Sequence, residues 1–461
     1  MDKKLHDFVD GNFDEMLNNL KGSLAVRSVL DESKMCAEHP FGDNMTEALE
    51  HFLACARKLG FKTKNVGNAA GHAEMGSGER LVGILAHLDV VPEGELSAWK
   101  ADPYAGEIID GKLYGRGTVD DKGPAFAALY AMKALKESVS ELGCRVRLIV
   151  GVDEESGSRC IKKYLAEEEI PSVSFSPDAS FPLINAEKGI MRVALSKKFH
   201  VKDGLSLISM KAGERFNVVP DRAEAVFSSE LPQTQIETLK AAERTEVISG
   251  AEGTVVRTSG VSAHAMNPEF GVNASFELFK ALSSITWGED ELQKHIAYLA
   301  HSISDTAGTA LGIECRDKVS GPLTCNAGIL RYSEGVCTLS LDIRYPVTLD
   351  GEEIFKKLKT EAEKHGVKAE LIGENKPLFV SAETPLVKKL LEAYKNVTGL
   401  DEAARSTGGG TYCRNLSNSV SFGPNLPGEV DLDHQPNEYI SLEHLKNITH
   451  IYAEALSLLT K

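Results

Sequence analysis

The sequence predicts an α/β protein. We expect a mostly parallel-sheet catalytic domain with helices on both faces, interrupted by an inserted α+β lid domain. Leu81–His87 and Arg145–Val152 are short apolar runs of the buried-strand type, and Ala125–Leu135 between them is rich in small residues, as in a helix that packs closely on a sheet. Strand, helix and strand in this order favour parallel pairing.

A different pattern begins near Ile190. The elements expected there are a strand at Met191–Phe199, a hairpin of Asn326–Tyr332 and Val336–Tyr345 across Ser333–Gly335, and helices at Ala274–Leu282 and Glu353–His365. Alternating strands joined by a tight turn predict antiparallel pairing, with the helices covering one face.

The pattern of the first segment returns after about Lys376. We expect a helix at Pro385–Val397, a Gly-rich turn at Ser406–Thr411, a strand at Ser419–Phe422 and a helix at Leu442–Leu459. Residues 1–189 and 380–461 would therefore form one catalytic domain, and residues 190–379 would be inserted into it as the lid.

The composition excludes several classes of function. The 461 residues include 51 Lys and Arg against 67 Asp and Glu, a formal net charge of −16. This surplus repels nucleic-acid phosphates and anionic lipid, so we expect no nucleic-acid partner and no membrane partner. Residues 1–22 lack the apolar core of a secretory signal, and the eight cysteines form no Cys-x-x-Cys pair. A cytoplasmic protein with reduced thiols is the simplest interpretation.

Five clusters of His, Asp and Glu follow predicted strands or tight turns. They are His87-Leu88-Asp89, Asp120-Asp121-Lys122, Asp153-Glu154-Glu155, Asp178 and Asp433-His434. One cluster alone also fits a solvated turn or a surface ion pair. Together they favour a divalent-metal site, because zinc, manganese and cobalt accept imidazole and carboxylate ligands. Two ions about 3.5–4 Å apart would need a bridging carboxylate and further ligands, and the set is large enough to supply them.

Motifs in the same order resemble those of the dinuclear metallopeptidase family of aminoacylases, carboxypeptidase G, succinyl-diaminopimelate desuccinylase and bacterial dipeptidases. The segments concerned are Gly83–Pro92, Leu113–Pro124, Asp153–Gly157 and Ser262–Ala265. Ser176–Pro182, Glu214–Pro220, Gly408–Tyr412 and Asp433–Glu438 are most similar to the PepV-type dipeptidases. The resemblance implies a metal-dependent dipeptidase that cleaves unblocked dipeptides by attack of a water bound to two metal ions.

The resemblance also implies the ligands of two divalent ions. Asp120 would bridge both ions. His87 and Asp178 would complete one site, and Glu155 and His434 would complete the other. Each ion would then keep open positions for water and substrate, as a catalytic site requires. Zinc is the metal we expect first, with manganese or cobalt as alternatives.

Three further residues are implied in catalysis. Glu154 would be the general base that takes a proton from the attacking water and passes it to the leaving amine. Asp89 would hold the ring nitrogen of the metal-binding histidine that does not bind metal. His264, in the inserted segment, would stabilise the oxyanion of the tetrahedral intermediate; without the resemblance, a histidine between small residues more often has a structural role.

Substrate binding is assigned to Asn217, Arg344, Gly409 and Gly410. Arg344 suits bidentate capture of a substrate carboxylate, although an ion pair with Asp342 is the alternative. Glycine amides near Gly409 and Gly410 can approach the same carboxylate because no side chain obstructs them.

The inserted segment is longer than the short dimerising domain of simple family members. In PepV-like chains an enlarged lid resembles two copies of that domain and lets one chain close its own site, so we expect a functional monomer with a small peptide substrate. Two alternatives stay open. The same site also fits an N-acyl amino acid amidohydrolase, and the same fold also hosts catalytically silent metal-binding proteins, which the intact ligand set and Glu154 disfavour.

Overall fold

The computed structural model describes residues 3–139, 141–200, 207–287, 290–428, 430 and 432–461. It divides into two compact units. Unit 1 comprises Met1–Asn185, Val380–Arg405 and Gly410–Lys461, and unit 2 comprises Ala186–Phe379 and Ser406–Gly409. The functional interpretation of these units as a catalytic domain and a lid stays a prediction.

Unit 1 is built on a mixed sheet with the strand order β1-β2-β6-β3-β7-β21-β8. The strands are β1 (Lys62–Val66), β2 (Ala70–Gly76), β3 (Leu81–His87), β6 (Arg145–Gly151), β7 (Val173–Ser176), β8 (Ile184–Glu187) and β21 (Ser419–Ser421). Strands β6, β3, β7 and β21 pair in parallel, whereas β1, β2 and β8 form the antiparallel pairings. The predicted α/β class is confirmed, with antiparallel strands flanking a parallel centre.

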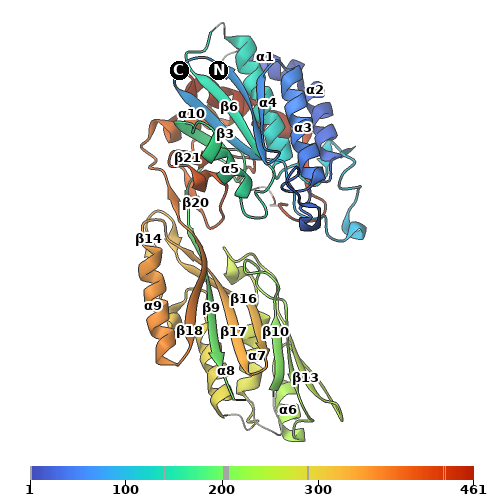
Figure 1. Cartoon of the computed structure of the whole chain (residues 1–461), viewed down its shortest axis with the longest axis vertical. Coiled ribbons are helices and arrows are strands. Elements are labelled where there is room, and N and C mark those ends of the chain that lie inside the picture. The colour runs from blue at the N-terminus through green and yellow to red at the C-terminus, as the bar shows by residue number, and fades with distance from the viewer. Residues whose placement is uncertain (1–2, 140, 201–206, 288–289, 429, 431) are drawn as a thin grey trace. The chain divides into compact units, whose positions relative to one another are not determined.

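Helices cover both faces of this sheet (Figure 1). They are α1 (Lys3–Gly11), α2 (Phe13–Leu24), α3 (Asp43–Lys58), α4 (Lys122–Ser138), α5 (Arg159–Glu167), α10 (Pro385–Thr398) and α11 (Leu442–Leu459). Gly71 of β2 faces Leu53 of α3, while its neighbour His72 bonds through Nδ1 to the Tyr164 hydroxyl of α5 at 2.7 Å. Successive strand residues point to opposite faces, so α3 and α5 lie on opposite sides.

A small antiparallel sheet in unit 1 joins distant parts of the chain. Its order is β22-β5-β4, with β4 at Glu107–Ile109, β5 at Lys112–Tyr114 and β22 at Tyr439–Ser441. Tyr439 lies opposite Tyr114. The segment before β22 is thereby brought beside the turn that follows β5, and both carry predicted metal ligands.

Unit 2 contains an eight-stranded sheet with the order β12-β13-β11-β10-β16-β17-β9-β18. Its strands are β9 (Gly189–Lys198), β10 (Leu207–Ala212), β11 (Arg222–Phe227), β12 (Thr245–Gly250), β13 (Gly253–Ser259), β16 (Thr324–Ser333), β17 (Val336–Tyr345) and β18 (Lys368–Asn375). The pairings are antiparallel. Glu334 and Gly335 both have positive φ, 50° and 75°, as the two-residue turn of the predicted hairpin requires.

The helices of unit 2 pack on this sheet around one apolar core. They are α6 (Gln233–Ala241), α7 (Ala274–Ser283), α8 (Asp290–Ser302) and α9 (Gly351–Lys364). Alternate strand residues such as Val193 and Leu339 are buried with Leu278 of α7 and Leu358 of α9.

Short elements complete the chain. They are η1 (Glu32–Lys34), η2 (Leu96–Ala98), η3 (Pro268–Phe270), η4 (Thr309–Leu311), η5 (Tyr412–Asn415), β14 (Arg316–Asp317), β15 (Gly321–Pro322), β19 (Leu378–Phe379) and β20 (Arg405–Thr407). Among the described residues, no helix combines the length and the apolar character that crossing a membrane requires.

Candidate metal centre

The predicted metal ligands of unit 1 converge where parallel strands end. β3 ends at His87, Asp178 follows β7, and the acidic turn after β6 carries Glu154 and Glu155. Strands β6, β3 and β7 are parallel neighbours, so their carboxyl ends share one edge of the sheet. Asp120 reaches the same edge from the turn before α4.

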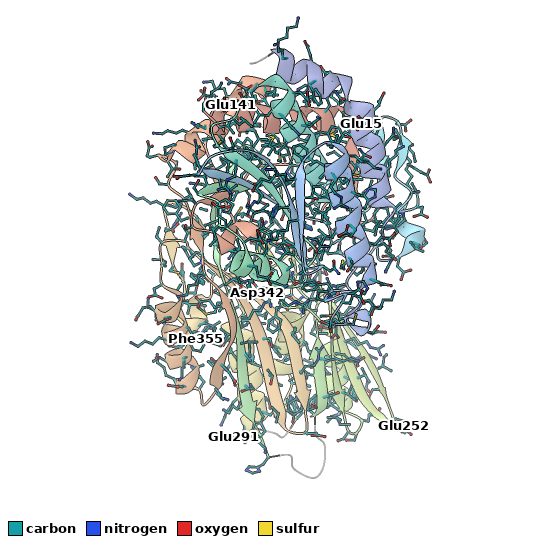
Figure 2. All side chains as sticks on the ribbon, turned by 45° about the horizontal axis from the view of Figure 1, so that its top comes forward. Glu15, Glu141, Glu252, Glu291, Asp342 and Phe355 are labelled. Atoms are coloured by element: carbon teal, nitrogen blue, oxygen red, sulfur yellow. The ribbon has the colours of Figure 1, made fainter. Side chains whose placement is uncertain are left out.

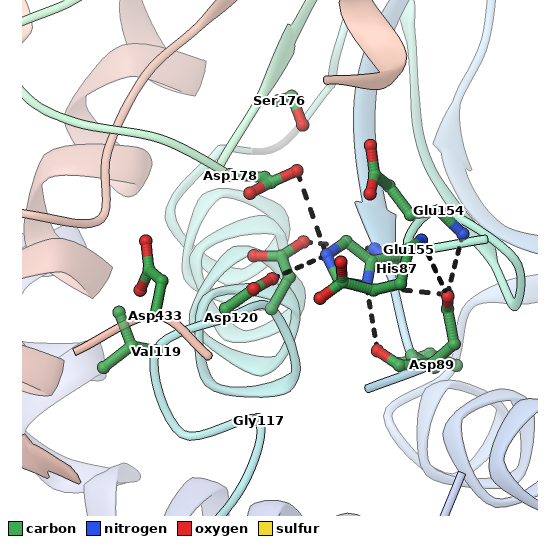
Figure 3. Close-up of polar contacts among 12 residues, drawn as sticks. His87, Asp89, Gly117, Val119, Asp120, Glu154, Glu155, Ser176, Asp178 and Asp433 are labelled. Atoms are coloured by element: carbon green, nitrogen blue, oxygen red, sulfur yellow. Dashed lines mark hydrogen bonds and ion pairs between the residues drawn. The ribbon is translucent and has the colours of Figure 1, made fainter. Parts of the chain in front are cut away.

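Asp120 lies between the two predicted histidine ligands. Its Oδ1 is 2.8 Å from His87 Nε2, and its Oδ2 is 3.2 Å from His434 Nε2. His434 Nε2 is also 2.9 Å from Glu155 Oε1, and His87 Nε2 is 3.8 Å from Asp178 Oδ2. Figure 3 shows Asp120 and Asp178 directed at the His87 ring. The five predicted ligands are thus brought together, and Asp120 presents one oxygen to each half of the set.

Two triads among the described residues have ligand atoms close enough to surround one ion. One is His87, Glu154 and Asp178, and the other is His87, Asp120 and Glu155, each with all ligand atoms within 4.8 Å of one another. Both share His87, which differs from the predicted division in which Asp120 is shared. The position of Glu154 inside a triad makes its role as base, rather than ligand, a matter for experiment.

The orientation of His87 suits a metal ligand. Its Nδ1 lies 2.9 Å from the main-chain oxygen of Asp89, an acceptor, so Nδ1 carries a proton. Nε2 is then the free ligand atom, and it faces carboxylate oxygens. Two acceptors facing each other are unfavourable unless a cation or a proton lies between them, so the donor set fits a bound divalent ion.

Burial and charge crowding shift the pKa of four acidic groups in the cluster, Asp120, Glu154, Glu155 and Asp178. Burial raises the pKa of Glu154 and Asp178 well above the usual range, and burial with the nearby Asp120 charge raises the pKa of Glu155 to about 7. Burial alone would raise the pKa of Asp120, but His434 and His87 hold it well below its usual value. Such a crowd of carboxylates is typical of a cation site.

The histidines show the complementary effect. Burial would lower the pKa of both, but Asp120 and Asp89 raise the pKa of His87 well above its ordinary value, and Asp120 and Glu155 raise that of His434 to about 11. His434 also has a left-handed backbone, with φ of 65°, which non-glycine residues rarely adopt. Its position is therefore set by the surrounding structure and not by local preference.

Asp89 makes a second set of hydrogen bonds that the sequence did not predict. Its side-chain oxygens accept the backbone N–H groups of Glu154 at 3.1 Å and Glu155 at 3.0 Å, while its Oδ1 is 3.5 Å from His87 Nδ1. The His87 ring is held more closely by the Asp89 carbonyl than by its carboxylate. Asp89 therefore fixes both the histidine and the turn that carries the acidic pair.

Asp121, a buried neighbour that we did not predict as a site residue, also supports this centre. Its Oδ2 accepts the backbone N–H of His87 at 3.1 Å. Asp153, part of a predicted cluster, instead forms an ion pair with Arg159 at 2.6 Å. Only the folded structure separates these supporting acids from the ligands.

Comparison with known proteins identifies the family. Residues 83–458 match the family described as "Peptidase family M20/M25/M40". The chain belongs to this family. The resemblance inferred from the motifs is thereby confirmed, and so is the enzyme class of a metallopeptidase.

The sequence similarity of this M20 family member to its relatives extends over nearly the whole chain. "Putative dipeptidase YtjP" of Bacillus subtilis (strain 168) is 39% identical, over 97% of this chain and 98% of its own. "Putative dipeptidase MW1694" of Staphylococcus aureus (strain MW2) is 36% identical, over 96% of each chain.

Solved structures share the M20 fold. Human carnosine dipeptidase 1 has a TM-score of 0.59 and 16% identity, covering 99% of this chain and 98% of that one. The M20 family metallo-carboxypeptidase Sso-CP2 of Sulfolobus solfataricus has a TM-score of 0.58 and 19% identity over 100% of both chains. At these identities the likeness shows the fold alone.

In unit 2 of this M20 chain, Asn217 and His264 lie on adjacent segments. Ala265 N–H donates to the Asn217 carbonyl at 2.9 Å, and Val218 pairs with His264 in an antiparallel bridge. The buried side chain of Asn326 on β16, which the sequence did not single out, donates to the Val218 carbonyl at 3.0 Å. Backbone pairing therefore holds the two segments side by side, and Met266 N–H also donates to His264 Nδ1 at 3.2 Å.

Arg344, on β17, already has a partner. Its Nε and Nη2 bond the buried carboxylate of Asp342, labelled in Figure 2, at 2.5 and 3.1 Å, and Nη1 donates to the Gly408 carbonyl at 2.9 Å. The Asp342 ion pair considered as the alternative is thus formed in this structure. Gly409 N–H donates to Thr407 Oγ1 at 3.0 Å. Capture of a substrate carboxylate by Arg344, Gly409 and Gly410 stays a prediction.

Proposed function

We propose that this M20 peptidase is a metal-dependent dipeptidase that cleaves unblocked dipeptides with two divalent ions per chain. The observation that supports this most directly is the placement of Asp120, whose two oxygens face His87 and His434 separately at 2.8 and 3.2 Å. A carboxylate shared by two ions needs this arrangement. The dipeptidase names of relatives that cover nearly the whole chain support the substrate class.

The proposed ligands are His87 and Asp178 for one ion, Glu155 and His434 for the other, and Asp120 for both. Bound divalent ions would supply Lewis acidity, lowering the pKa of a water molecule and polarising the peptide carbonyl. We propose zinc first, with manganese or cobalt as alternatives, because all three accept this mixed donor set.

Glu154 is the proposed general base. It would take the proton of the attacking water and deliver it to the leaving amine, a role worth about 10²–10⁴-fold in rate. The Asp89 carboxylate holds the Glu154 backbone at 3.1 Å, so the base is presented from a fixed turn. Burial raises the pKa of Glu154, which makes it a stronger proton acceptor once ionised.

The substrate-binding roles in unit 2 complete the proposal. His264 would stabilise the oxyanion, and Asn217 would contact the substrate. Arg344 would contact a substrate carboxylate with the N–H groups that Asp342 and the Gly408 carbonyl do not use. We further propose a functional monomer located in the cytoplasm.

A substrate panel tests the proposal. Apoenzyme reloaded separately with Zn²⁺, Mn²⁺ or Co²⁺ is assayed on unmodified dipeptides, their C-terminal amides, and N-acetyl and N-succinyl amino acids, with Asp120→Asn as the inactive control. Preferential cleavage of unmodified dipeptides is expected. Faster cleavage of the N-acyl amino acids would identify a deacylase instead.

A further inference from the structure

Glu438 is fully buried and lies against the turn that carries Asp120. Its carboxylate accepts the backbone N–H groups of Gly117 at 3.0 and 3.1 Å, Val119 at 2.9 Å and Asp120 at 3.3 Å. These donors form the turn that ends in Asp120. A carboxylate with this many N–H partners is committed to shaping that turn, because each unmet donor would be costly in a buried site.

Arg116 neutralises this carboxylate from the other side. Its Nη1 lies 2.8 Å from Glu438 Oε2, and both side chains are at most 2% exposed. Arg116 Nη1 also donates to the Gln435 carbonyl at 3.2 Å, and its guanidinium lies over the Trp99 ring at 5.2 Å. A charge buried to this extent is tolerated only when it is paired and hydrogen-bonded, as here.

Further contacts around Glu438 hold the segment that carries His434. Gly115 N–H donates to the Glu438 carbonyl at 3.0 Å, continuing the pairing of β22 with β5. Asn437, with a left-handed φ of 66°, is fixed through its side chain: Oδ1 accepts the Lys100 N–H at 2.5 Å, and Nδ2 donates to the Ala98 carbonyl at 2.7 Å. Glu438 lies four positions after His434, so its side chain links the turn of Asp120 to the segment that carries His434.

We propose that Glu438, supported by Arg116, is a positioning residue that fixes Asp120 and His434 relative to each other and thereby sets the affinity of the metal ion between them. Its oxygens are occupied by N–H donors and Arg116, so it acts through the ligands and not as one. The inference rests on the proposed function only in taking Asp120 and His434 as ligands.

Glu438→Gln is the direct test. The amide keeps the shape of the side chain but presents an NH₂ group where the turn requires an acceptor. Calorimetric titration of the apoenzyme with Zn²⁺ should show one of the two ions weakened by about 10–100-fold, the usual effect of removing a residue that orients a ligand. Full wild-type affinity for both ions in a folded variant overturns the proposal.

Glu74→Gln is the matched control. Glu74 forms a largely buried pair with Arg147 at 2.6 Å in the same unit, on β2 and β6. The Glu74→Gln variant should have a lower melting temperature but an unchanged affinity for both metal ions. If it weakened metal binding as much as Glu438→Gln does, the effect would be general destabilisation and the proposal would fail.

A double-variant cycle separates positioning from stability. If Glu438 acts through His434, then adding Glu438→Gln to His434→Ala should reduce metal affinity much less than it does in the wild type. Additive losses contradict the proposal. Should Glu438→Gln not fold, Glu438→Asp replaces it: the shorter carboxylate keeps the charge but cannot reach the turn, and wild-type metal affinity there would count against the inference.

These measurements distinguish this proposal from the dipeptidase assignment. Metal affinity is measured from the heat of binding and does not depend on an activity assay. A chain that binds two ions in a Glu438-dependent way but cleaves no dipeptide would reject the substrate class alone, whereas an active dipeptidase whose metal affinities ignore Glu438 would reject the positioning role alone.

Discussion

The two units hold their predicted functional side chains in different ways. In unit 1 the side chains hold one another: Asp120 contacts both His87 and His434, and Asp89 fixes the turn of Glu154. In unit 2, His264 is exposed and its segment is held by backbone pairing. Removing a ligand side chain from the unit 1 cluster should therefore disturb its neighbours and the metal, whereas removing the exposed His264 side chain should alter kinetics alone.

The largest effect is expected for Asp120→Asn. Loss of the shared charge removes a ligand from both ions, so the variant should lose bound metal and essentially all hydrolysis of dipeptides. Elemental analysis beside an activity assay measures both. Active wild-type enzyme carrying a single tight ion would defeat the dinuclear proposal and with it the shared role of Asp120.

Glu154→Gln should have the next largest effect on activity. Turnover should fall by about 10²–10⁴-fold because the proton carrier is lost, while both ions remain. Glu155→Gln is the matched neighbour and should instead weaken one ion. Equal metal content and similar rates in the two variants would show that the acidic pair is assigned wrongly.

His264→Ala tests the exposed group of unit 2. Loss of one oxyanion donor should lower kcat by about 10²–10³-fold, with metal content unchanged. His301→Ala, which removes another exposed histidine from the same unit, is the control and should be silent. An unaltered kcat in His264→Ala would show that His264 has no catalytic role.

Arg344→Lys should have the smallest effect. The lysine keeps the positive charge but loses the planar fork, so KM for dipeptides should rise by about 10- to 100-fold with little change in metal binding. Dipeptides should also be cleaved far better than their amides by the wild type. Equal kcat/KM for a dipeptide and its amide would leave Arg344 with its Asp342 partner and no substrate role.

The sequence was most informative where local patterns decide the structure. Leu81–His87 and Leu442–Leu459 were predicted with the observed limits, because apolar runs and helical periodicity are local properties. Strands β10 to β13 were not predicted; β12, for example, alternates between half-buried and exposed residues and carries a weak apolar signal. Its pairing depends on neighbours that the sequence does not display.

The same distinction applies to the candidate centre. Residues that would touch a metal, such as His87 and Asp178, were found because strand ends and motifs mark them. Asp121 and Glu438 lie within segments that the motifs mark, but their supporting roles, and that of Asn326, were not predicted, since the role of a buried polar side chain is recognisable only once its partners are in place. Arg344 shows the limit most clearly: the sequence offered two partners, and the structure forms the bond with Asp342.

Strand β21 has a consequence for how the chain is made. It pairs with β7 on one side and β8 on the other, yet it lies near the C-terminus, after all the strands of unit 2 have been synthesised. A growing chain therefore carries an open gap between β7 and β8, with two unpaired strand edges, until Ser419–Ser421 emerge from the ribosome. A chain truncated before Ser419 should accordingly be cut more readily by protease near β7 and β8 than the full chain. His434 follows β21 in the sequence, so both the sheet and the candidate metal centre stay incomplete until residues beyond the inserted unit have been synthesised.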